Sequence, residues 1–126
     1  MADDWDRAVR KLIELTEAGS IRWETVPRLG GDRDRNLQQI GPAYVSTVNG
    51  RRIAVYEFQE LSWVEELEKM MPGASKVAVE FVNEALEPIW KWPAPDFRWE
   101  LLDSIRYQQA DGNEFLKSFL ADSPAP

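Results

Sequence analysis

The strongest constraint on this chain is a turn signal, Asn49-Gly50, which lies between two runs rich in β-branched and aromatic residues. The stretch 42–58 has the sequence PAYVSTVNGRRIAVYEF. Asn and Gly both tolerate a positive φ, and a tight turn of this kind matches the right-handed twist of paired antiparallel strands. The sequence therefore predicts a β-hairpin over these residues, around which the rest of the fold is organised.

Two registers of this hairpin are compatible with the residue pattern. A two-residue loop pairs Tyr44 with Val55, whereas a three-residue loop pairs Val45 with Val55. A slip of one residue changes which side chains share a face. The longer loop sorts the apolar residues more cleanly, because it places Val45 with Ile53 and Val55, and it is favoured here. Both faces carry apolar residues in either register, so we expect helices on one face and a loop or a partner on the other.

Length and composition indicate an ordinary globular protein. The 126 residues are 44% hydrophobic and 29% charged. A chain of this length can bury roughly two-thirds of its unfolded surface without disulfides or metals. We expect one α+β domain over residues 1–121 and a frayed C-terminal tail over 122–126.

The residue types that are missing exclude several kinds of chemistry. The sequence has no Cys and no His, which excludes disulfides, cysteine zinc sites, a Ser-His-Asp triad and a histidine-metal hydrolase. Its net charge is −7, and it shows no basic stripe of the kind that nucleic-acid binding requires. No catalytic, metal or cofactor site is expected, and nucleic acid is not an expected partner.

The segment MADDWDRAVRK at the N-terminus lacks the apolar core of a secretory signal. No apolar run approaches the length needed to span a membrane. We therefore expect no membrane association and a cytoplasmic location.

Hydrophobic periodicity places the other elements. An apolar stripe that includes Trp5, Val9 and Leu12 predicts a first helix from Asp3 or Asp4 to Ala18, which Gly19 ends. Alternation predicts a strand over 20–26, followed by an exposed loop over 28–41. The loop contains Gly30-Gly31 among arginines. These residues offer an anion cradle, but the spacing of a phosphate loop is missing and a solvated loop is favoured.

The second half of the chain contains one segment that stays ambiguous. Residues 62–71 fit a short helix with capping-box spacing, or a loose crossing loop. A second hairpin over 76–93 is favoured over a helix at 74–86, because β-branched residues dominate. Asp96 is predicted to cap a helix that runs to Gln109. Asn113 is predicted to cap a last helical turn or two with an apolar side formed by Phe115, Leu116, Phe119 and Leu120.

Together these elements predict an α+β fold, an antiparallel β-meander of four to five strands with N- and C-terminal helices packed on one face. The segments LIELTEAGSIRWETV, VEFVNEALEPIWKWP and LLDSIRYQQADGNEFLKSFL resemble those of small uncharacterised bacterial α+β proteins. In these proteins a helix, a Gly turn, a β-meander and a Trp- and Pro-containing segment precede a closing helix. The resemblance covers most of the chain, implies a bacterial or phage cytoplasmic origin, and transfers no activity.

Aromatic residues supply the candidate site. The chain has six tryptophans, most of which are expected in the core, while Trp63 beside Met70 and Met71 is the best candidate for an exposed patch. Arg51 and Arg52 at the hairpin tip are a candidate receptor for an acidic partner. The acidic side chains that follow are expected to form a solvated surface; they are Glu57, Glu60, Glu65, Glu66 and Glu68.

These features lead to a functional prediction. We expect a small non-enzymatic protein-interaction module, such as an adaptor, an inhibitor or an immunity-type factor, whose partner is another protein or a second copy. The alternative is a module that binds a sugar or a nucleotide through Trp and Arg side chains. An enzyme built on Asp, Glu, Arg and Tyr ranks third.

Overall fold

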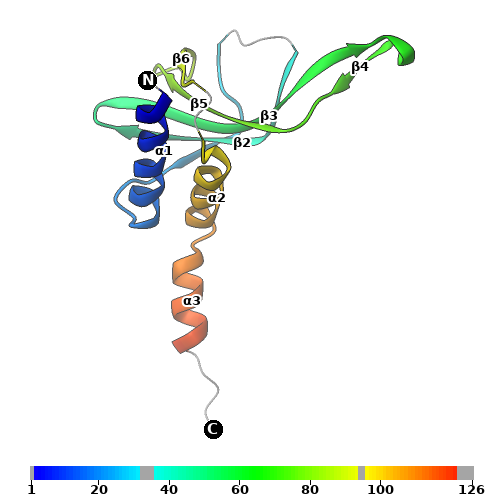
Figure 1. Cartoon of the computed structure of the whole chain (residues 1–126). Helices are drawn as coiled ribbons and strands as arrows, with labels where there is room; N and C mark the ends of the chain where they lie inside the picture. Colours follow the sequence, from blue (N-terminus) through cyan, green and yellow to red (C-terminus); the bar gives the residue numbers. More distant parts are fainter. Residues whose placement is uncertain (1, 32–35, 94–95, 122–126) are drawn as a thin grey trace.

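The computed structural model describes residues 2–31, 36–93 and 96–121. These residues form an antiparallel sheet of six strands and three α-helices (Figure 1), which confirms the α+β class and adds a strand to the predicted number. Along the sheet the order is β1-β2-β3-β5-β6, and β4 pairs with β3 beyond the end of this sheet. The elements are α1 (Ala2–Glu17), β1 (Glu24–Val26), β2 (Leu37–Val48), β3 (Arg51–Val64), a 3-10 turn (Glu65–Leu67), β4 (Lys69–Pro72), β5 (Lys76–Val82), β6 (Pro88–Lys91), α2 (Arg98–Gln109) and α3 (Gly112–Ala121).

The first helix has the predicted position and the predicted buried stripe. Val9, Leu12 and Thr16 are buried. Gly19 adopts a φ of 74°, and the amide of Ser20 donates to the carbonyl of Leu15 at 2.9 Å. The left-handed glycine thus closes the C-terminal turn of α1 and redirects the chain toward β1.

The β2–β3 hairpin has the two-residue loop, so the favoured three-residue register was wrong. Tyr44 pairs with Val55 and Val48 with Arg51. Asn49 and Gly50 have φ values of 51° and 73°, the conformation that a two-residue turn of this type requires. The apolar pattern did not decide the register because both faces of the sheet are covered, and the chemistry of the turn decided it instead.

The main core lies between one face of the sheet and the helices α1 and α2 (Figure 1). Its buried members are Val9, Leu12, Trp23, Tyr44, Ile53, Val55, Val77, Val79, Trp92, Leu101, Leu102 and Ile105. The two helices lie side by side, and Gln108 joins them because its side-chain amide donates to the carbonyl of Thr16 at 3.1 Å. This packing confirms that terminal helices cover one face.

The opposite face of the sheet is covered by loops, as expected. Tyr56 and Phe58 are buried there, with Leu29 and Leu86 packed over the neighbouring strands. Part of the predicted exposed loop is therefore wrong: Leu29 contacts this core, and residues 37–40 belong to β2. Residues 32–35 of that loop lie outside the described residues.

The starts of β1 and α2 differ from the prediction. β1 is limited to Glu24–Val26. Helix α2 begins after Phe97, which has a φ of 68° and offers no side-chain cap. The predicted cap, Asp96, instead donates its backbone amide to the Asp6 carboxylate at 2.7 Å, which ties the start of α2 to α1. The second hairpin, β5–β6, is confirmed.

Helix α3 does not pack on the sheet. It begins at Gly112, one residue before the predicted cap, and none of its residues is buried. In Figure 1 it continues away from the body beyond the end of α2. The predicted tail over 122–126 lies outside the described residues. Within the described ranges, no helix has both the length and the apolar character needed to cross a lipid bilayer.

Candidate functional site

The candidate site lies on a hairpin that projects from the sheet, formed by residues 61–72 and called the arm from here on (Figure 1). The outer part of β3 pairs with β4, and the 3-10 turn joins the two strands. Both interpretations of this segment, a helix and a crossing loop, were wrong. The capping-box spacing has no effect because Val64 precedes the turn and no side chain caps it.

The arm is anchored at its base and turns sharply at its tip. At the base, the amide of Leu61 donates to the carbonyl of Asn36 at 2.7 Å, and that of Gly73 to the carbonyl of Glu60 at 2.8 Å. At the tip, Glu68 adopts a φ of 49°. The backbone hydrogen bonds between β3 and β4 therefore hold the arm in an extended form, although β4 is joined to the sheet through β3 alone.

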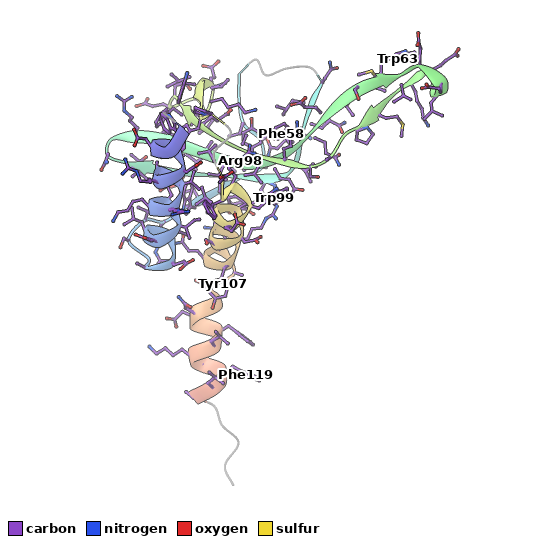
Figure 2. All side chains as sticks on the ribbon, viewed as in Figure 1. Phe58, Trp63, Arg98, Trp99, Tyr107 and Phe119 are labelled. Atoms are coloured by element: carbon purple, nitrogen blue, oxygen red, sulfur yellow. The ribbon has the colours of Figure 1, made fainter. Side chains whose placement is uncertain are left out.

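Two of the predicted site residues lie together on this arm. Trp63 is the cross-strand partner of Met70, which places the two side chains on the same face. Trp63 is 59% exposed and Met70 is 40% exposed. Leu67, in the turn, is 54% exposed, and Figure 2 shows Trp63 at the outer part of the arm, far from the helices. These three residues form what we call the arm patch.

The third predicted residue, Met71, lies on the other face of the arm. It pairs with Ser62, and neighbouring residues of a strand point to opposite faces. Met71 is also less exposed than Met70. The predicted group of Trp63, Met70 and Met71 is therefore divided between the two faces of the arm, and Leu67 adds an exposed apolar side chain at the turn.

Arg51 and Arg52 are not part of the same site. They begin β3, whereas Trp63 lies near its end, about 40 Å away for an extended strand from residue 51 to residue 63. The guanidinium carbon of Arg51 lies 5.8 Å from the centroid of the Phe81 ring, and Arg52 is half-buried. The two arginines therefore border the aromatic edge of the sheet rather than the arm.

Acidic side chains surround the tip of the arm. Glu65, Glu66 and Glu68 are exposed in or beside the turn, and Lys69 follows them. An exposed apolar patch bordered by an excess of carboxylates attracts basic partners and repels anionic ones. The arrangement is thus suited to contact with a protein surface rather than with phosphate groups.

The other exposed tryptophans differ from Trp63. Trp90 packs against Trp5 with ring centroids 5.1 Å apart. The ring centroids of Trp5 and the buried Trp92 lie 4.8 Å apart. Trp5, Trp90 and Trp92 therefore form an aromatic extension of the core. Trp99 is exposed on α2, which itself packs on the sheet. Trp63 is the exposed tryptophan that lies on a projecting hairpin.

A groove lies away from the arm, beside the junction of α2 and α3. It has a volume of about 760 Å³ and lies among the end of α1, residues 18–22, the end of α2 and the first turn of α3. Its charged lining consists of Glu17, Arg22, Asp103, Asp111 and Glu114. Sequence reasoning missed this groove because its residues are supplied by separate elements without a shared motif. Its lining contains no tryptophan, so the groove does not bring Trp and Arg together for a sugar or a nucleotide.

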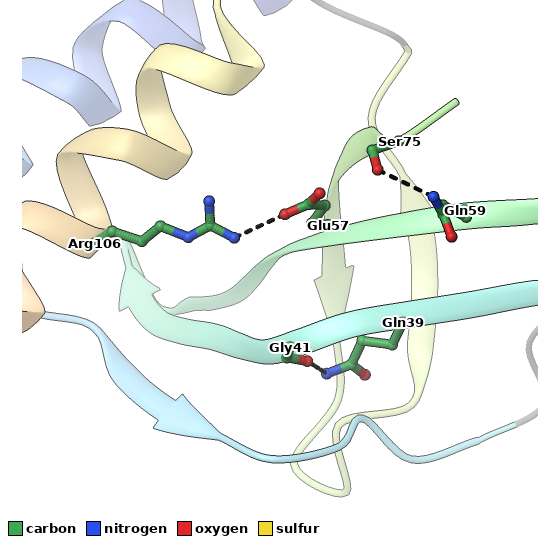
Figure 3. A network of polar contacts seen from close by, with 6 residues as sticks. All are labelled: Gln39, Gly41, Glu57, Gln59, Ser75 and Arg106. Carbon is green, nitrogen blue, oxygen red and sulfur yellow. Dashed lines mark hydrogen bonds and ion pairs between the residues drawn. The ribbon is translucent and has the colours of Figure 1, made fainter. Parts of the chain in front are cut away.

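One predicted surface carboxylate has a structural role instead. Glu57 accepts a hydrogen bond from the Arg106 guanidinium at 2.9 Å (Figure 3), and its side chain is 16% exposed. The hydrogen bond to Glu57 raises the pKa of Arg106 above its ordinary value, although burial acts in the opposite direction. Glu57 thus fastens β3 to α2. The other four predicted surface carboxylates, Glu60, Glu65, Glu66 and Glu68, are exposed.

The chain matches no protein-family model, and no curated protein or solved structure matches it significantly. Among residues 2–31, 36–93 and 96–121, no group of three or more acidic side chains is placed to hold a metal ion.

Proposed function

We propose that this protein is a small, non-enzymatic protein-interaction module that binds a partner through the arm patch. The observation that carries the proposal is the exposed Trp63–Met70 pair on a hairpin that projects from the sheet. Tryptophan is enriched among residues that dominate binding energy, and the flexible Met side chain adapts to the surface that it meets.

The position of the patch supports binding rather than folding. The side chains of Trp63, Leu67 and Met70 are absent from the buried clusters that hold the sheet together. Burial of one large apolar side chain contributes about 1.5–3 kcal/mol. Three such side chains on one patch therefore supply a substantial binding free energy when a partner covers them.

The acidic tip specifies the chemistry of the partner. Glu65, Glu66 and Glu68 favour a protein with an apolar pocket for Trp63 and lysine or arginine side chains around it. An adaptor, an inhibitor and an immunity-type factor all act by such binding, and the proposal covers this shared step. The alternative, a sugar or nucleotide module, stays a prediction, and the groove beside α3 has no tryptophan in its lining to support it.

Affinity capture from the host lysate tests the proposal. The tagged full chain is compared with Trp63→Ala and Met70→Asp, and the retained proteins are quantified by mass spectrometry. Trp99→Ala is the matched control, because Trp99 is also an exposed tryptophan but lies on α2. We expect a near-stoichiometric protein on the wild type and on the control, and its loss from both arm variants.

The same variants must keep their fold for this result to count. We expect their melting temperatures to match that of the wild type, because the substituted side chains are exposed. Equal capture by all four proteins would refute a role for the arm patch. A wild type that retains no protein would refute the proposed function itself.

A further inference from the structure

Helix α3 presents a second group of exposed apolar residues, far from the arm in the sequence. Its four large apolar side chains are between 45% and 67% exposed; they are Phe115, Leu116, Phe119 and Leu120. Phe115 and Phe119 stack on each other, with centroids 5.3 Å apart and ring planes 14° apart. At 100° per residue, all four fall on one side of the helix, while Glu114 and Lys117 fall on the other.

The junction with α2 keeps α3 away from the sheet. The Tyr107 ring lies so close to Gly112 that a Cβ atom at this position would overlap the ring. The Tyr107 hydroxyl donates a hydrogen bond to Asn113 at 3.1 Å. Tyr107 thus sets the direction in which α3 leaves α2, and the apolar side does not fold back onto the core.

A helix of this length has little stability of its own. Isolated helices shorter than about 12–15 residues are marginal in water, and most helical stability comes from packing of an apolar face. α3 has ten residues, none of them buried. Its apolar side therefore gains the packing that stabilises other helices when another surface covers it.

The charged residues at the base of α3 indicate the chemistry of the surface that covers its apolar side. The groove beside its first turn is lined by the carboxylates of Glu17, Asp103, Asp111 and Glu114, against the single guanidinium of Arg22. A protein that encloses α3 also meets this acidic groove. The enclosing protein is therefore expected to carry positive charge where it faces this groove.

We propose that α3 is a second docking element, which inserts its apolar side into an apolar groove of another protein whose rim carries lysine and arginine. This is the helix-in-groove mode of recognition, with Phe115, Leu116 and Phe119 as anchors at helical spacing. The proposal is independent of the arm patch. If both hold, the chain joins two partners, one at the arm and one at α3.

A second copy of this chain fits the requirement less well. Its groove is lined by four carboxylates against one guanidinium, and each copy carries a net charge of −7. The same negative charge opposes binding to an anionic lipid surface.

Site-specific photocrosslinking of the full chain in its host tests the proposal. The crosslinking amino acid p-benzoylphenylalanine replaces Phe119, and in a control chain it replaces Ile89, which is 65% exposed on β6. We expect a heterologous protein joined at position 119 and not at position 89. A self-crosslinked dimer, a lipid adduct or no specific product at position 119 would overturn the proposal.

The crosslinked protein is then purified and its affinity for the full chain is measured by titration calorimetry. We expect Phe119→Asp to weaken binding about tenfold or more, and Trp63→Ala to leave it unchanged. We also expect binding to weaken as NaCl is raised from about 50 mM to about 500 mM, because screening shortens the reach of the charges.

Unchanged affinity of Phe119→Asp, or affinity that does not depend on salt, would overturn this assignment. Loss of binding in Trp63→Ala would also overturn it, because the captured protein would then be the partner of the arm. Failure at α3 with successful arm-dependent capture leaves the proposed function standing, so the two proposals fail separately.

Discussion

The two halves of β3 differ in their surroundings: the first half is buried in the core, and the second half forms one strand of the arm. Residues 53–56 are buried on both faces, beneath α1 and α2 on one side and beneath Leu29 and Leu86 on the other. Residues 61–64 of the same strand have β4 as their neighbour and stay largely exposed. The difference does not come from the strand, since both halves carry large apolar residues. It comes from which other segments of the chain reach each half.

The largest expected effect contrasts two aromatic residues of β3. Phe58 is 1% exposed and packs with Tyr56 and Ala43, so Phe58→Ala leaves a cavity and is expected to lower the free energy of unfolding by about 3–5 kcal/mol. Trp63→Ala, in the outer half, is expected to change it by about 0.5 kcal/mol or less. Urea titrations of both variants measure these values. Similar losses would mean that the arm belongs to the cooperative fold.

A smaller effect is expected where the loop covers the inner half of the strand. Gly31 and Gly41 both have a positive φ, 83° and 71°. A Cβ atom at Gly31 would lie 2.9 Å from Glu87 and Pro88, whereas one at Gly41 meets nothing within 4 Å. Gly41→Ala is expected to cost about 1 kcal/mol through backbone strain, and Gly31→Ala about 2 kcal/mol or more because steric overlap is added.

Thermal unfolding of the two glycine variants provides the measurement. Equal shifts in melting temperature would show that the close approach of residues 27–31 to the turn before β6 contributes nothing to the cover of this face.

The ion pair between β3 and α2 is expected to have a still smaller effect. Arg106→Gln removes the partner of the half-buried Glu57 carboxylate and is expected to cost about 1–2 kcal/mol in the free energy of unfolding. Arg7→Gln is the control, because Arg7 pairs with Asp4 where both side chains are largely exposed, and such pairs contribute little.

The pH dependence of this ion pair has a defined sign. The pKa of Arg106 is raised in the folded state, so its contribution is fully present below the pKa of the unfolded chain. It is lost only as the pH rises through the folded value, in strongly alkaline solution. We therefore expect the difference in unfolding free energy between Arg106→Gln and the wild type to stay constant from about pH 6 to pH 9. A difference that falls across this range would contradict the assignment.

The smallest expected effect concerns α2 and α3, adjacent helices of similar length. Leu101, Leu102 and Ile105 of α2 are fully buried, whereas α3 buries none of its residues. Backbone amides of α3 are therefore expected to exchange with solvent deuterium faster than those of α2 in the isolated protein. Equal protection in the monomer would show that α3 is stable without a partner.

Local signals in the sequence predicted most of the fold. The stripe through Val9 and Leu12, the Asn49-Gly50 turn and the β-branched run at Val77 each act over a few residues, and each produced the predicted element. The register at Asn49-Gly50 was wrong because the apolar pattern is ambiguous when both faces are covered. The glycine pair Gly30-Gly31 is explained by close packing against Ala85 and Glu87, a contact with no local signal.

The candidate site could be predicted in part. Trp63 and Met70 were identified from residue type, but the strand pairing that joins them depends on how far β3 extends, which the capping-box spacing at Ser62 and Glu65 obscured. Leu67 was not predicted as a site residue. It is exposed because it lies in the turn at the tip of the arm, and that turn was not predicted. The apolar side of α3 was identified, yet periodicity alone does not distinguish a helix face that packs on the core from one that projects.

Hydrogen exchange of the full chain, alone and saturated with the protein that the arm-dependent experiment captures, tests the central claim most directly. The account predicts slower exchange over residues 61–72 in the complex and unchanged exchange over residues 53–58, which are already buried. Unchanged exchange over the arm, with protection on another surface, would contradict the assignment of the arm as the binding site.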